Sequence, residues 1–206
     1  MLLEKIYLSG PALDTISISA IEASHSESRG FLFGYVSQNG IYNCVNSCPI
    51  LHTDRKPTEV SYSNETALNR VRRFVKLMND CAERPYKFIA GYHVHPFTKG
   101  DDLGILSRLS KQDKEKDELI WGDALSLGQN SWIELVVRLI KSDGTEDKYF
   151  SFRHFKKRLG LNLCFGDNLS DSKYSLMFSA FHLTPSQKND KLIKAKEIKV
   201  VTNGYK

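Results

Sequence analysis

The segment KFIAGYHVHP, residues 87–96, is the stretch from which the fold can best be argued. Its apolar character predicts a buried strand, and Pro96 predicts the end of that strand because proline donates no ladder hydrogen bond. Side chains two apart on a strand share a face, so His93 and His95 should project together while Val94 faces the opposite packing layer. Two imidazoles on one rigid element could hold a metal ion. Taken alone, however, two histidines on a strand are more often ordinary polar residues than ligands.

Before and after this strand in the sequence, the spacing of apolar residues predicts alternating strands and helices. Asn39-Gly40 predicts a hairpin turn between the two strands that flank it. We expect an α/β fold in which helices sandwich a mixed, mostly antiparallel sheet. The expected strands are residues 4–9, 30–37, 40–46, 58–63, 87–95, 132–140, 148–155, 173–183 and 197–202, and the expected helices are residues 12–27, residues 64–83 and a short helix that begins at residue 110.

Composition narrows the class of protein. A chain of 206 residues with a net charge of +5 suits one domain with solvated basic faces, and no binding motif points to nucleic acid. No window approaches the eighteen or so apolar residues of a membrane span, so we expect a cytoplasmic protein without a membrane partner. The four cysteines suit neither a disulfide framework nor a zinc knuckle, and we expect free thiols at Cys44, Cys48, Cys81 and Cys164.

Two further groups of polar residues have a spacing that suits a metal site. Ser110 and Asp113 form a helix N-cap signature, which would fix both side chains at a helix entrance. Asp113 could then complete a site of two imidazoles and one carboxylate, with Ser110 beside it as an oxyanion donor. Glu27 precedes GFLFG, a buried strand bounded by Gly30 and Gly34. Taken by itself, Glu27 is better interpreted as a solvated acid at a helix end.

Together, Glu27, His93-Val-His95-Pro96 and Ser110-Lys-Gln-Asp113 resemble the JAMM motif of the JAB/MPN metalloprotease family. The resemblance implies Zn²⁺ bound by His93, His95 and Asp113, with Glu27 as the general base and Ser110 as the oxyanion donor. It implies a zinc isopeptidase that cleaves after the C-terminal tail of ubiquitin or a ubiquitin-like protein, with conjugation-pathway proteins as further partners. It also implies the MPN/JAB, cytidine-deaminase-like layout over residues 1–158. Residues 159–206 go beyond the minimal domain of the family, and we expect an extension packed on the same domain that adds strands to the sheet edge or binds a partner.

The spacing departs from the family at one place, because fourteen residues separate His95 from Ser110. A longer surface loop costs little closure entropy, so an insertion is tolerated here. The enlarged loop at 96–109 is a lid over the site, a loop that contacts the substrate, or a plain insertion. Two alternatives to an isopeptidase remain open. One is a non-catalytic MPN-type scaffold, although such proteins typically lack motif residues that are complete here. The other is a RadC-type domain acting on nucleic acid, whose His-x-His-Pro-Ser-Gly run is not matched by Phe97-Thr98.

Overall fold

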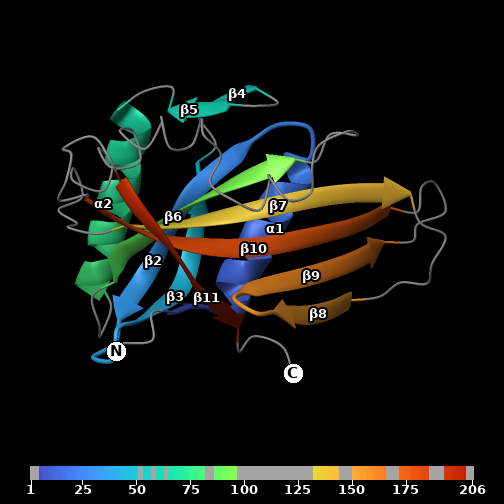
Figure 1. The fold of residues 1–206 in the computed structure, drawn as a ribbon. Coiled ribbons are helices and arrows are strands. Elements are labelled where there is room, and N and C mark those ends of the chain that lie inside the picture. Colours follow the sequence, from blue (N-terminus) through green and yellow to red (C-terminus); the bar gives the residue numbers. More distant parts are fainter. Residues whose placement is uncertain are drawn as a thin grey trace.

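The computed structural model of the chain describes residues 5–50, 53–56, 59–62, 65–81, 86–96, 132–143, 150–165, 172–185 and 193–202. Strands dominate this part of the chain, and two helices accompany them (Figure 1). The helices are α1 (Gly10–Glu22) and α2 (Glu65–Cys81). The strands are β1 (Lys5–Leu8), β2 (Ser28–Val36), β3 (Ile41–Pro49), β4 (Thr53–Lys56), β5 (Glu59–Tyr62), β6 (Lys87–Pro96), β7 (Trp132–Asp143), β8 (Phe150–Phe155), β9 (Arg158–Phe165), β10 (Ser172–Pro185) and β11 (Ile193–Thr202).

Seven of the described strands pair in a closed ring, so the main sheet is a barrel. The order around the ring is β11-β1-β3-β2-β6-β7-β10, and β10 pairs again with β11. Lys5 on β1 lies opposite Lys199 on β11 in a parallel pair, while Ala180 on β10 lies opposite Ile198 in an antiparallel pair. β9 and β8 extend the sheet past β10, and β4 and β5 form a separate hairpin.

This architecture corrects the α/β sandwich expected from the sequence. The described residues form a mostly β structure with a closed seven-stranded barrel and two helices, rather than a sheet covered by helical layers. Alternation predicts strands near 173–183 and 197–202, and strands do occur there. It does not predict their partners, because strand pairing is decided by packing between segments far apart in the sequence. The expected α/β sandwich was therefore wrong, because the strands pair in a closed barrel.

The barrel interior holds the main apolar core. Helix α1 packs chiefly against β3, and its buried face supplies Leu13 and Ile16 to the same cluster as Tyr92 and Val94 of β6. Ser9 caps the helix by accepting a hydrogen bond from the backbone N–H of Ala12. The helix ends at Glu22, earlier than expected.

A second apolar layer lies on the outer face of β2. Phe31 contacts Phe88 and Trp132, with ring centroids 5.3 and 6.3 Å apart. Phe33 contacts Phe74 of α2 with ring centroids 6.5 Å apart. Leu32, between these two phenylalanines, belongs to the interior cluster that α1 joins. The two helices therefore contact opposite faces of β2, and β2 is apolar on both sides as the GFLFG run predicts.

The residues expected to form a C-terminal extension contribute β9, β10 and β11. The boundary placed at residue 158 falls at the start of β9. β10 and β11 are both members of the ring, so this part of the chain packs in the same unit as the residues before it. No helix among the described residues has the length and apolar character needed to cross a membrane.

Replacing Ile198 by Ala tests whether β11 belongs to the barrel core. Ile198 is 2 % exposed, so its truncation leaves a cavity and should lower the free energy of unfolding by about 2–5 kcal/mol. The matched control is Lys199→Ala at the next, exposed position, which should change that free energy by about 0.5 kcal/mol or less. Urea denaturation followed by circular dichroism measures both. Equal stabilities for the two variants would mean that β11 lies outside the cooperative core.

Candidate metal centre

β6 carries His93 and His95 through the middle of the sheet, between β2 and β7. Tyr92 and Val94 belong to the interior cluster, so the two histidines face the outer side, as the two-residue period of a strand predicts. Both are buried, with 6 % and 8 % of their surface exposed. The Nε2 atom of one ring lies 3.0 Å from the Nε2 atom of the other. The structure thus brings together the two imidazoles that the sequence predicts as ligands.

A glutamate on the neighbouring strand orients His93. Nδ1 of His93 lies 2.6 Å from Oε1 of Glu134, a β7 residue that is 1 % exposed. Because a carboxylate accepts hydrogen bonds and does not donate them, Nδ1 is the donor, and in the neutral ring this arrangement leaves the lone pair on Nε2. The indole N–H of Trp132 donates to the other carboxylate oxygen of Glu134 at 3.0 Å. Each oxygen of Glu134 therefore has its own donor.

Glu27 meets the other histidine. It lies immediately before β2, not at the end of the first helix as expected. The Oε1 atom of Glu27 lies 3.2 Å from Nδ1 of His95, and Glu27 is 8 % exposed. This contact is on the side of the imidazole away from Nε2. The geometry directly supports a role in orienting His95, while the general-base role implied by the JAMM resemblance stays a prediction.

The two histidines fit zinc as ligands. Nδ1 of each ring lies near a carboxylate, and the two Nε2 atoms, 3.0 Å apart, are close enough to share a hydrogen bond or to bind one cation together. Two nitrogens on one tetrahedral zinc, each at about 2.0–2.1 Å, would be about 3.3 Å apart, close to the observed separation. Carboxylates that fix metal-binding histidines in this way are a usual outer layer of such sites.

The described residues supply two of the three expected ligands. They contain no group of three His, Cys, Asp or Glu side chains arranged to hold a metal ion. Asp113, the predicted third ligand, and Ser110, the predicted oxyanion donor, lie outside the described part of the chain, as does most of the enlarged loop at 96–109. Those assignments therefore stay predictions.

Two glycines on β6 and β2 make room for side chains of the neighbouring strand. A Cβ atom at Gly91 would lie 2.7 Å from Oε2 of Glu134, and one at Gly30 would lie 2.4 Å from the ring of Tyr92. Gly91 is the residue opposite Glu134 in the parallel pair of β6 with β7. Gly30 is the residue opposite Tyr92 in the pair of β2 with β6. Close approach to the site thus explains Gly91, whereas Gly30 makes room for Tyr92 on the interior face of the sheet.

The sequence reasoning missed Glu134 and its neighbour on the same face, Arg138. Both lie in WIELVVRLI, a run that is otherwise apolar, and both are buried in the structure. A charged residue inside an apolar strand must find a partner when it is buried. That signal was available in the sequence. Naming His93 as the partner of Glu134 required the parallel pairing of β6 with β7, which the sequence does not show.

Burial disfavours Cys44 and Cys48 as catalytic nucleophiles. Cys44, Cys48 and Cys81 are free thiols, as expected for these three. Burial raises the pKa of Cys44, and it raises the pKa of Cys48 as well. A raised pKa lowers the fraction of the reactive thiolate. Cys44 is one of the residues buried in the core, which suits a packing role.

Comparison with known proteins supports the fold but not a family. No protein-family model and no curated protein matches the chain. The solution structure of protein DSY2949 from Desulfitobacterium hafniense is similar in fold, with a TM-score of 0.53 and 14 % sequence identity. The match covers 97 % of this chain and 94 % of that chain. At this identity the likeness concerns the fold alone.

Proposed function

We propose that this chain is a zinc-dependent isopeptidase or peptidase that cleaves the amide bond after the C-terminal tail of a ubiquitin or ubiquitin-like protein. One observation carries the metal part of the proposal: the Nε2 atoms of His93 and His95 lie 3.0 Å apart, with a carboxylate at Nδ1 of each ring. The substrate class rests on the resemblance of the motif residues to the JAMM family. The proposed enzyme acts in the cytoplasm, as expected from the composition.

In the proposed site, His93, His95 and Asp113 hold the metal. When bound, zinc polarises the substrate carbonyl and makes water a nucleophile near neutral pH. Glu134 and Trp132 keep the imidazole of His93 in the tautomer that presents Nε2. Glu27 takes the proton of the attacking water at a carboxylate oxygen and returns it to the leaving amine. The hydroxyl of Ser110 donates a hydrogen bond to the developing oxyanion.

Zinc binding is expected at one ion per chain, with an affinity that depends on Glu134. Glu134→Gln replaces one acceptor oxygen by an NH₂ donor, so Gln cannot accept from both His93 and Trp132. We expect zinc affinity to fall by about 10–100-fold. Competition with a chromophoric chelator measures the affinity, and circular dichroism checks the fold. Glu22→Gln, at an exposed position of α1, is the matched control.

Equal zinc affinities for the Glu134→Gln and Glu22→Gln variants would remove Glu134 from the metal centre. A wild-type chain that binds no zinc, together with an unaltered fold in His93→Ala, would instead favour the non-catalytic scaffold.

Turnover is expected to depend on the carboxylate of Glu27 separately from metal binding. In Glu27→Gln the amide oxygen keeps a polar contact with Nδ1 of His95, but it cannot take a proton. We expect kcat on ubiquitin-like fusion proteins to fall by about 10²–10⁴-fold, with one zinc still bound per chain. Removing zinc from the wild-type enzyme with a chelator should abolish the same cleavage. Near-normal turnover by Glu27→Gln would leave Glu27 a positioning residue and sink its role as the base.

A further inference from the structure

Residues that lie opposite one another on successive strands form a row that begins at the metal centre and crosses the outer face of the sheet. His95 on β6 lies opposite Arg138 on β7. Arg138 lies opposite Met177 on β10, and Met177 lies opposite Gly160 on β9. Gly160 in turn lies opposite Arg153 on β8. Partners in such pairs share a face of the sheet, so the row leads from one histidine to two arginines.

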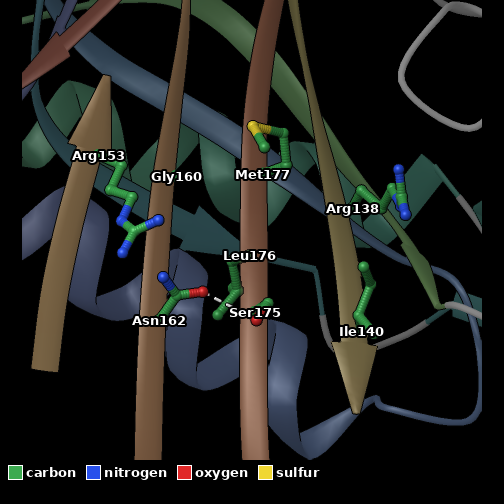
Figure 2. A pocket seen from close by; sticks show the side chains of 8 residues that line it. All are labelled: Arg138, Ile140, Arg153, Gly160, Asn162, Ser175, Leu176 and Met177. Atoms are coloured by element: carbon green, nitrogen blue, oxygen red, sulfur yellow. Dashed lines mark hydrogen bonds between the residues drawn. The ribbon is translucent and has the colours of Figure 1, made fainter. Parts of the chain in front are cut away.

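A pocket of about 240 Å³ lies on this row. Figure 2 shows the guanidinium of Arg153 directed toward β9, on the side of Asn162, with Arg138 beyond β10. Met177 and Ile140 supply apolar lining. The hydroxyl of Ser175 donates a 2.8 Å hydrogen bond to the side-chain oxygen of Asn162. This volume is below the roughly 300–1,000 Å³ of small-molecule sites, so the pocket suits one side chain better than a cofactor.

The charges at the pocket select an anion. Among the described residues that line it, two are arginines and none is acidic. Arg138 is only 7 % exposed, while Arg153 is exposed. Guanidinium groups form charge-assisted hydrogen bonds with carboxylates, often in a bidentate manner. Met177 and Ile140, which line the same pocket, suit the short aliphatic stem of a glutamate.

We propose that this pocket is a specificity subsite that takes an acidic side chain of the substrate, with Arg153 as its main binding residue. The inference rests on the proposed peptidase function. Neighbouring strands are about 4.8 Å apart, so the row runs about 10 Å from His95 to Met177 and about 19 Å to Arg153. An extended peptide rises about 3.3 Å per residue. The acidic residue therefore lies about three to six residues from the bond that is cut.

The test uses internally quenched peptides with a Gly-Gly cleavage site and the zinc-loaded full chain. Both peptide ends are blocked, so the only acid is a single Glu, placed at each of the third to sixth residues on either side. Matched peptides carry Gln at the same place. We expect one position at which Glu raises kcat/KM about three- to tenfold over Gln, through KM. Arg153→Gln should reduce this ratio to about one.

Arg73→Gln removes the same charge from an exposed position of α2 and should leave the ratio as in the wild type. Equal kcat/KM for Glu and Gln at every position, in peptides that are cut, would overturn the subsite and leave the peptidase function standing.

If no peptide is cut, cleavage of ubiquitin-like fusion proteins decides the proposed function, and fluorescence anisotropy of labelled peptides tests the pocket by itself. Tighter binding of a Glu peptide, lost in Arg153→Gln, would then support the anion pocket. Equal binding of the Glu and Gln peptides would overturn it.

Discussion

The hydrogen bond between His93 and Glu134 is the constraint on which the outer face of the sheet depends. Both side chains are buried, and a buried carboxylate or imidazole without a partner would cost several kcal/mol. The bond requires β6 and β7 to lie side by side in one register, and it requires Gly91 to leave space for the carboxylate. Trp132 satisfies the remaining oxygen. The contact between His93 and Glu134, which are 41 residues apart in the sequence, thus accounts for several sequence features on the two strands.

Much of the local structure could be predicted from the sequence. The strand at 87–96, the hairpin around Asn39-Gly40 and the helix at 65–81 follow from periodicity and turn chemistry, which are short-range properties. The closed barrel could not be predicted in the same way. Its closure depends on pairing of β11 with both β1 and β10. No periodicity within a segment identifies a partner nearly two hundred residues away.

In the candidate site, too, the short-range features could be predicted from the sequence and the long-range contacts could not. The two-residue period of one strand is enough to place His93 and His95 on one face, and that expectation is confirmed by the 3.0 Å contact of their rings. Their carboxylate partners come from other elements, so they depend on register. Glu27 could be singled out as an acid next to a Gly-bounded strand, but its contact with His95 follows from the pairing of β2 with β6. Glu134 could have been identified from the sequence as a charged residue in an apolar run, but its partner could not.

Closure of the ring by β1 and β11 also affects the rate of folding. Lys5 pairs with Lys199, so the last pairing that closes the barrel joins segments separated by nearly the whole described chain. Contacts between segments so far apart in the sequence are slow to form, because the chain loses conformational entropy before the contacts stabilise it. During synthesis the histidines of β6 emerge well before β11, and until β11 arrives β1 has one unpaired edge. The order in which the chain is made therefore separates formation of the metal-binding strand from completion of the fold that holds it.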